Sequence, residues 1–239
     1  MSRTQTAIRG LTLGAIVVAC AAGCSLISPS AAPNGLQRQI SQGAKVDAEG
    51  RSAKASTASR VRAKPSTAER TAAEVPGKDI TAVGDSVMLA VSLPLQQAFP
   101  GIHIDAVVSR FMSAGLSEVQ QLAASGGLRP VVIVGLGTNG GVTAQQVHQL
   151  MAIVGSKRKV VLVNTFVPLP YEQDTNSVLA AAARTYPNVV LANWNQTISH
   201  RTSLLWPDGI HPQPSGAKVY AAMIKTAVAV ICHEHGATC

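Results

Sequence analysis

Aromatic side chains are scarce in this chain of 239 residues, in which Phe, Trp and Tyr together make up 3%. A buried core must therefore be built mainly from Val, Ile, Leu and Ala, which dominate the 46% of hydrophobic residues. The net charge of +8 is concentrated toward the N-terminus: residues 31–78 contain nine Lys and Arg against four Asp and Glu, whereas residues 79–239 contain nine against eight. A nucleic-acid-binding protein would need a basic folded surface with interleaved aromatics, so the composition argues against that class.

Long hydrophobic runs are also missing beyond residue 24, where nothing approaches the roughly 20 apolar residues that a membrane-spanning helix needs. Residues 1–24 are typical of a bacterial export signal, with Arg3 and Arg9 before a short apolar stretch that ends in small residues. VVAC and AAGC, which end at Cys20 and Cys24, resemble lipoprotein cleavage sites, whose cysteine is lipidated. Cys24 is favoured because Ala-Gly commonly precedes that cysteine, and an ordinary signal peptide is the alternative. We therefore predict an exported protein, in the cell wall or lipid-anchored on the outer face of the bacterial cytoplasmic membrane.

Residues 25–78 are rich in Ser, Ala, Thr, Pro, Gly, Arg and Lys and show no sustained apolar period. Such a segment buries too little apolar surface to offset the entropy of ordering. We predict a disordered basic tether between the anchor and the body of the protein. Its charge either holds it against anionic wall polymers or only keeps an ordinary linker hydrated.

Two further cysteines, Cys232 and Cys239, lie close to the end of the chain. In an exported protein they are free to form a disulfide that closes a small loop. His233 and His235 lie nearby and would allow a metal cluster, but the spacing matches no standard zinc pattern. We predict the disulfide, and neither a metal nor a cofactor.

From residue 79 onward, short β-type runs alternate with helical segments. Strands are predicted at residues 80–83, 102–108, 130–137, 159–164 and 188–193, and helices at 87–99, 117–124, 143–154, 174–186 and 214–231. This alternation is typical of a parallel sheet with helices on both faces, a three-layer α/β sandwich.

Polar side chains follow three of the predicted strands. Ser86 stands in Gly-Asp-Ser after the first strand, and Asn139 lies among glycines after the third. Asp208 and His211 follow the fifth strand in the stretch WPDGIHPQPSG, which is too rich in Pro and Gly to be helical. Because the carboxyl ends of parallel strands meet at one edge of a sheet, we expect these four side chains to lie close together.

Together these groups would suffice for nucleophilic catalysis. His211 would take the proton of the Ser86 hydroxyl, and Asp208 would fix the tautomer and orientation of the imidazole. The side chain of Asn139 and the backbone N–H of Ser86 would then stabilise the oxyanion that develops on an ester carbonyl. The alternatives are structural, with Ser86 as a helix cap and the other three as turn residues. Asp85 is expected to hold its turn by hydrogen bonds rather than to react.

Three motifs, VGDSVML, GLGTNG and WPDGIHPQPSGAKVYAAMI, resemble the blocks of the SGNH (GDSL-like) hydrolases. The resemblance covers about residues 79–231 and is strongest to the extracellular domain of bacterial peptidoglycan O-acetyltransferases. It implies a flavodoxin-like five-stranded sheet, a triad of Ser86, Asp208 and His211, and Asn139 in the oxyanion hole. The family usually has a glycine after the second strand whose N–H also serves the oxyanion. Here Ser109 stands at that place, and its backbone N–H takes the same predicted role.

Two neighbouring residues are candidates for substrate binding. Arg110 either contacts substrate or is a solvated surface residue. Trp206 either stacks on a sugar ring or packs the acid–base loop onto the body of the protein.

The predicted function is that of an exported serine esterase or acyltransferase, with residues 79–239 as its catalytic domain. Its substrate would be an acylated, most often O-acetylated, glycan of the cell envelope. Transferases of the similar family usually carry a large membrane domain, for which this sequence has no counterpart. Either a separate membrane protein donates the acyl group, or water is the acceptor. The alternatives are a non-catalytic glycan-binding module on the same fold and a lipase or thioesterase for longer acyl chains.

Overall fold

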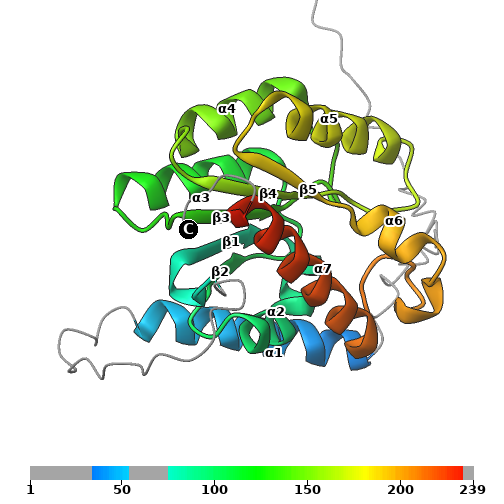
Figure 1. Ribbon diagram of the computed structural model, residues 1–239. Helices are drawn as coiled ribbons and strands as arrows, with labels where there is room; N and C mark the ends of the chain where they lie inside the picture. Colours follow the sequence, from blue (N-terminus) through cyan, green and yellow to red (C-terminus); the bar gives the residue numbers. More distant parts are fainter. Residues whose placement is uncertain (1–33, 54–74, 234–239) are drawn as a thin grey trace, which may run out of the picture. The chain divides into compact units, whose positions relative to one another are not determined.

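The protein is built around a parallel sheet of five strands, shown in Figure 1. The structure, a computed structural model, describes residues 34–53 and 75–233. The strand order is β2-β1-β3-β4-β5, which is the flavodoxin-like order. The strands are β1 (Ile80–Gly84), β2 (His103–Ala106), β3 (Val131–Gly135), β4 (Lys159–Val163) and β5 (Val189–Ala192). The predicted fold class is therefore confirmed.

Helices follow the strands much as the sequence predicted. They are α2 (Ser86–Ala98), α3 (Met112–Ala124), α4 (Ala144–Val154), α5 (Glu172–Thr185) and α7 (Pro214–His233). The short helix α6 (Trp194–Ser199) and two 3₁₀ turns, η1 (Gly77–Asp79) and η2 (Thr202–Leu204), were not predicted. Helix α6 is capped by Asn193, whose side chain accepts a hydrogen bond from the backbone N–H of Gln196 at 3.1 Å.

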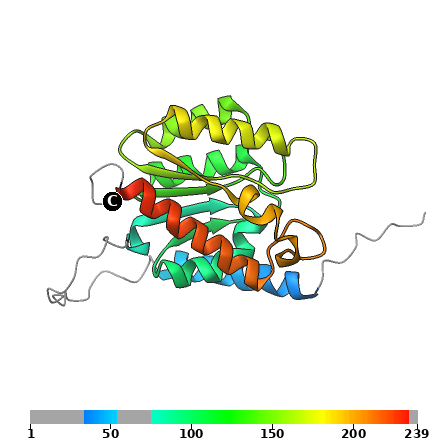
Figure 2. The same ribbon diagram turned by 45° about the vertical axis from the view of Figure 1, so that its right-hand side comes forward.

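Two hydrophobic cores lie on opposite faces of the sheet. Helices α3, α4 and α5 cover one face, and α2 and α7 cover the other (Figures 1 and 2). Successive strand residues point to alternate faces, so that Val131 and Ile133 belong to the core under α2 and α7, whereas Val132 and Val134 belong to the other. Burial of both faces explains why β3 is a continuous apolar run in the sequence.

Among the described residues, one helix is long and apolar enough to cross a membrane, namely α7 over Pro214–Cys232, and half of that window is buried inside the protein. Tyr220, Ile224 and Ile231 are almost fully buried and belong to the core cluster. Helix α7 also contacts α2, β4 and β5. It is thus a core helix of this body, as its position across the sheet in Figure 2 shows.

Helix α1 (Asn34–Ala53) departs from the prediction. The predicted tether over residues 25–78 was wrong for this part, which forms a helix packed on α2. A stripe of four residues faces the body at helical spacing: Leu36, Ile40, Gly43 and Val46. The composition of the segment hides this stripe, because polar and charged residues fill the positions between its members.

Several predictions fall on residues outside the described ranges. They concern the signal segment with Cys20 and Cys24, the remaining tether, and the pairing of Cys232 with Cys239. Cys232 itself is buried near the end of α7. The lipid anchor and the disulfide stay predictions.

Candidate active site

Ser86 lies at a tight turn between β1 and α2. Gly84 is required there, because a Cβ at that position would lie 2.3 Å from the Cβ of Met88 in the following helix. Asp85 caps α2, and its side chain accepts a hydrogen bond from the backbone N–H of Val87 at 2.9 Å. The alternative that Ser86 is only a helix cap is therefore wrong, and the expected role of Asp85 in holding the turn is confirmed.

The acid–base loop lies between η2 and α7 and is held by its own hydrogen bonds. Asp208 Oδ1 accepts from the backbone N–H of Ile210 at 2.9 Å and of His211 at 3.1 Å. Gly209 adopts a φ of 70°, a left-handed conformation that glycine tolerates best. The Trp206 backbone N–H donates to the His211 carbonyl at 2.8 Å and closes the loop. Asp208 and His211 thus lie in a turn, as the structural alternative predicted. Their side chains also make contacts beyond that turn.

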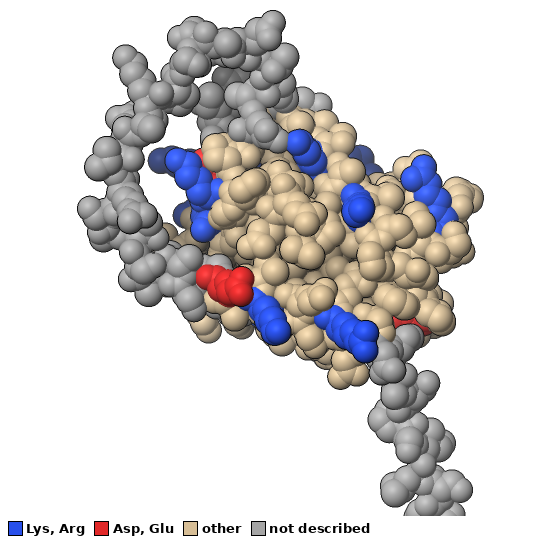
Figure 3. Space-filling view, turned by 90° about the horizontal axis from the view of Figure 1, so that it is seen from below, with Lys and Arg blue, Asp and Glu red and all other residues tan. Residues whose placement is uncertain are grey.

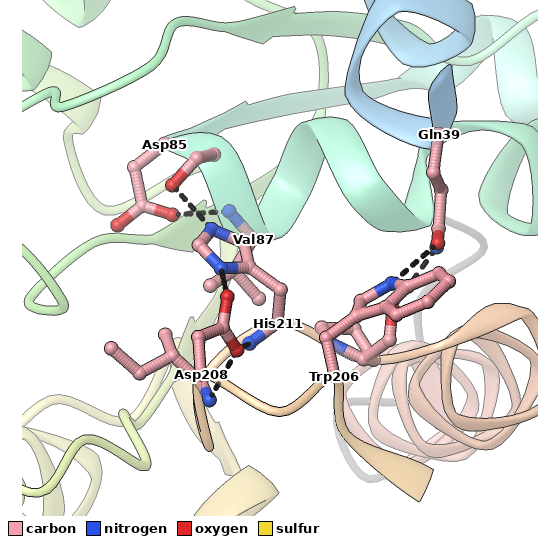
Figure 4. Close-up of polar contacts among 9 residues, drawn as sticks. Gln39, Asp85, Val87, Trp206, Asp208 and His211 are labelled. Atoms are coloured by element: carbon pink, nitrogen blue, oxygen red, sulfur yellow. Dashed lines mark hydrogen bonds and ion pairs between the residues drawn. The ribbon is translucent and has the colours of Figure 1, made fainter. Parts of the chain in front are cut away.

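The same loop brings the acid and the base to Ser86 (Figure 4). Asp208 Oδ2 lies 2.8 Å from His211 Nδ1, and His211 Nε2 lies 2.8 Å from Ser86 Oγ. A carboxylate can only accept, so the network places the imidazole proton on Nδ1 and leaves the Nε2 lone pair for the Ser86 hydroxyl. The structure thus brings together three side chains that are up to 125 residues apart in the chain.

The carboxyl group of Asp208 is suited to stay ionised. Burial raises its pKa, but hydrogen bonds from the Ile210 backbone and from the side chain and backbone of His211 outweigh burial, and the net pKa lies below its ordinary value. Its side chain is 30% exposed, against 16% for that of His211. The arrangement can therefore hold a negative charge beside the imidazolium that forms when His211 takes a proton.

Asn139 reaches the same edge of the sheet from the loop after β3, where its side chain is already hydrogen-bonded. Its Nδ2 atom donates to Asp85 Oδ2 at 3.1 Å and, more weakly, to the Arg110 carbonyl at 3.4 Å. Asp85 is fully buried, and burial raises its pKa to about 6, against lowering contributions that include the Val87 N–H and His211. Asp85 thus positions Asn139 as well as α2.

Ser109 lies in an exposed turn directly after β2. The turn is closed by a hydrogen bond from the Arg110 N–H to the Val107 carbonyl at 3.3 Å. Ser109 has a φ of 60°, and among the described residues it is the only one other than glycine with a positive φ. The chain therefore keeps a backbone conformation that favours glycine at the place where the similar family has one.

Arg110 is not the solvated surface residue that one alternative predicted, and its contact with substrate stays a prediction. Its guanidinium is buried and forms an ion pair with Asp105 at 2.6 Å. It also donates to the carbonyls of Asp105 at 2.8 Å and Gly84 at 3.2 Å. Sequence alone did not suggest this pairing, since it depends on how the turn after β2 folds back. Arg110 thus supports the turn that carries Ser109.

Trp206 follows the packing alternative. The indole Nε1–H donates to Gln39 Oε1 at 3.0 Å, and a Cβ at Gly35 would lie 2.3 Å from the ring (Figure 4). Both contacts are with α1, which the sequence had assigned to the tether. Gln39 is therefore a residue near the site that the sequence analysis missed, and its spacing, three residues after Leu36 and four before Gly43 of the apolar stripe, was the available signal.

Within residues 34–53 and 75–233, no group of three or more His, Cys, Asp or Glu side chains is placed to hold a metal ion.

No protein-family model matches the chain, but it is similar in sequence to several curated proteins. YrhL of Bacillus subtilis, whose name assigns it provisionally to the peptidoglycan O-acetyltransferases, is 38% identical over 151 residues, which is 63% of this chain and 24% of the relative. Peptidoglycan O-acetyltransferase OatA of Listeria monocytogenes is 36% identical over 143 residues, 60% of this chain and 23% of the relative. This chain thus spans about a quarter of the length of these relatives.

A solved structure shows the same fold. The C-terminal catalytic domain of peptidoglycan O-acetyltransferase A from Streptococcus pneumoniae, with a methylsulfonyl adduct, matches with a TM-score of 0.60 at 22% identity, over 66% of this chain and 96% of that domain. Sequence similarity and fold agree: part of this chain resembles part of the bacterial peptidoglycan O-acetyltransferases, and it has the fold of the Streptococcus pneumoniae catalytic domain.

Proposed function

We propose that this protein is a serine O-acetylesterase or O-acetyltransferase that acts on a cell-envelope glycan through an acyl-serine intermediate. The observation that carries the proposal is the continuous relay from Asp208 through His211 to Ser86, with 2.8 Å at each step. The names of the relatives, which are peptidoglycan O-acetyltransferases, support peptidoglycan as the glycan. A glycan-binding module would have no use for this relay.

The relay supports the following first half-reaction. Ser86 Oγ bonds to the acyl carbonyl carbon while its proton passes to His211 Nε2. The imidazolium is stabilised by the ionised Asp208. When the tetrahedral intermediate collapses, the bond between the carbonyl carbon and the leaving oxygen breaks, and that oxygen takes the proton from Nε2. The product is an acyl group on Ser86 and a free hydroxyl.

The second half-reaction decides between esterase and transferase. A nucleophile gives its proton to His211 Nε2 and bonds to the acyl carbon, the bond from that carbon to Ser86 Oγ breaks, and Oγ takes the proton back from His211. Water makes the protein an esterase, and a sugar hydroxyl makes it a transferase. In the transferase case a separate membrane protein donates the acyl group. The predicted lipid anchor would hold the protein beside that donor, on the outer face of the membrane.

The surface of α1 fits a location near anionic envelope polymers. Figure 3 shows Lys and Arg side chains spread over the face on which α1 lies, with uncharged surface and a smaller number of Asp and Glu side chains between them. Arg38 and Lys45 are exposed on α1 itself. Scattered positive charge of this kind supports weak attraction to a polyanion.

The decisive test is hydrolysis of p-nitrophenyl acetate by the purified protein. We expect turnover that Ser86→Ala reduces by at least about 10³-fold. Ser113→Ala, which removes an exposed hydroxyl in the first turn of α3, is the matched control and should retain activity. If wild type and Ser86→Ala are equally inert, the non-catalytic binding module is the better interpretation.

Acceptor and chain length need separate measurements. A chito-oligosaccharide added to the assay and analysed by mass spectrometry shows an acetylated sugar only if the protein is a transferase. Longer acyl chains remain an alternative because three apolar side chains near Ser109 are exposed: Val107 at 45%, Val108 at 53% and Phe111 at 55%. Faster hydrolysis of octanoate than of acetate esters would favour the lipase or thioesterase alternative.

A further inference from the structure

Helix α1 contacts both the helix that begins with Ser86 and the loop that carries the acid and the base. Gln39 makes these contacts with one side-chain amide (Figure 4). Its Nε2 atom donates to the Ala90 carbonyl of α2 at 2.7 Å and to the Pro212 carbonyl at 3.0 Å. Its Oε1 atom accepts from Trp206 Nε1 at 3.0 Å. Both hydrogens and the oxygen of the amide are therefore used to join α2 to the loop.

The Ala90 carbonyl of α2 can accept from Gln39 because a proline later in the helix leaves it without its usual donor. The carbonyl of Ala90 would normally accept from the N–H four residues later in the helix. That residue is Pro94, which lies inside α2 and has no N–H. An unsatisfied backbone carbonyl in a packed interface is unfavourable, and the Gln39 amide supplies the missing donor. The irregularity that Pro94 creates in α2 is thus matched by a side chain from α1.

Two glycines allow α1 to come close enough for this contact. A Cβ at Gly43 would lie 2.0 Å from the backbone oxygen of Leu89, next to Ala90. A Cβ at Gly35 would lie 2.3 Å from the Trp206 ring. Glycine inside a helix costs roughly 1 kcal/mol relative to alanine, so these positions indicate that close packing outweighs helix propensity in α1.

Among the described residues, the hydrogen bonds between the acid–base loop and α2 are that of His211 to Ser86 and those made through Gln39, while Leu205 and α7 on either side of the loop pack in the same core as α2. The loop's internal hydrogen bonds, such as those of Asp208 and the Trp206 N–H, set its own shape. They do not set its distance from Ser86. The hydrogen bonds of Gln39 to Trp206 and Pro212 lie on either side of Asp208 and His211 in the sequence, so they fix both ends of the loop against α2.

We propose that Gln39 is a positioning residue, which holds residues 206–212 where His211 Nε2 meets Ser86 Oγ. The proposal rests on the proposed function and adds α1 to the parts that the reaction needs. A displacement of about 1 Å at such a site reduces turnover strongly, whereas binding of a small ester depends little on the relay. Loss of Gln39 should therefore lower kcat and leave KM nearly unchanged.

The test compares Gln39→Leu with Gln42→Leu in the full chain. Gln42 is exposed on α1, so the control makes the same substitution away from the loop. With p-nitrophenyl acetate, we expect Gln39→Leu to lower kcat at least about tenfold with KM within about twofold, and Gln42→Leu to match wild type. Trp206→Phe removes the indole N–H donor and part of the ring that packs at Gly35 but leaves the bond of Gln39 to Pro212, so it should give a smaller loss, about threefold. If kcat of Gln39→Leu stays within twofold of the control, the positioning role is wrong.

A spectroscopic measurement separates this proposal from the proposed function. The His211 Nδ1 proton, which donates to Asp208, can be followed by proton NMR at low field. We expect its signal to shift or broaden in Gln39→Leu and to stay in place in Gln42→Leu. If wild type hydrolyses no ester, the proposed function fails, and the NMR signal alone decides the role of Gln39. An unchanged signal in Gln39→Leu overturns that role.

Discussion

The two sides of Ser86 differ in how far they are prepared for reaction. On the acid–base side, His211 contacts both Ser86 and Asp208 at 2.8 Å. On the predicted oxyanion side, the Asn139 amide donates to acceptors of the protein itself, Asp85 and the Arg110 carbonyl. The His211 side is thus aligned for proton transfer, whereas the Asn139 amide already donates its hydrogen bonds within the protein.

This difference follows from when each side acts. The proton of Ser86 must leave as soon as the substrate carbonyl is in place, so its acceptor has to be aligned beforehand. The oxyanion exists only in the transition state, and a half-buried amide without an acceptor would cost about 1–3 kcal/mol until then. The longer contact of Asn139, 3.4 Å to the Arg110 carbonyl, is the one that an oxyanion would replace at least cost.

The largest expected effect is on the acid–base side, for Asp208→Asn. The Oδ1 atom of the new amide can still accept from Ile210 and His211, so the loop keeps its shape. The amide nitrogen, however, would face His211 Nδ1 and favour the wrong tautomer. We expect kcat for p-nitrophenyl acetate to fall about 10⁴-fold. Asp174→Asn, an exposed change in α5, should have no such effect, and a loss below tenfold for Asp208→Asn would contradict the relay.

The next effect is on the oxyanion side, for Asn139→Ala. Loss of one preorganised donor typically costs about 10²–10³ in kcat, and KM should change little because the ground-state ester hardly uses this donor. Asn195→Ala is the matched control, since Asn195 donates to the Thr165 carbonyl instead. Equal kcat for the two variants would remove Asn139 from the proposed oxyanion hole.

Asp85 and Asp208 should change the stability of the protein in opposite directions when the pH is lowered. The folded-state pKa of Asp85 is raised to about 6, so the folded protein binds more protons than the unfolded chain between pH 6 and about 4. The unfolding free energy of wild type minus that of Asp85→Asn should therefore rise by up to about 3 kcal/mol as the pH falls through this window. The pKa of Asp208 is lowered, so its contribution to stability is lost on acidification. Urea unfolding across pH, with Asp208→Asn as the comparison, should give differences of opposite sign.

Much of the fold and the main groups of the site could be predicted because their signals are local. Each strand is a short apolar run, and each functional side chain comes directly after a strand or stands in a turn rich in glycine and proline. Ser86, Asn139 and His211 were placed at one edge of the sheet by the rule that parallel strands end there. Asp85 was expected to hold its turn, and it does.

What could not be predicted depends on distant contacts. Gln39 and Trp206 are 167 residues apart, and the sequence around either residue does not indicate a contact with the other. The ion pair of Arg110 with Asp105 depends on the direction of one turn. The composition of residues 34–53 suggested disorder, but the narrow apolar stripe, together with Gly35, is enough for packing on a partner surface that offers an unsatisfied backbone carbonyl. Such complementarity is a property of two surfaces and is not visible in one segment.

The smallest expected effect concerns the turn after β2. A positive φ strains the backbone of Ser109 in this turn, whereas the acid–base loop has a glycine, Gly209, at its position of positive φ. Ser109 has a φ of 60°, which costs a residue with a Cβ roughly 1 kcal/mol. We expect Ser109→Gly to raise the unfolding free energy by about 0.5–1 kcal/mol in urea and to keep kcat within about twofold, since the backbone N–H is retained. Ser117→Gly, within α3, should lower stability by a few tenths of a kcal/mol. If both substitutions destabilise the protein, the Ser109 side chain contributes more than its conformation costs.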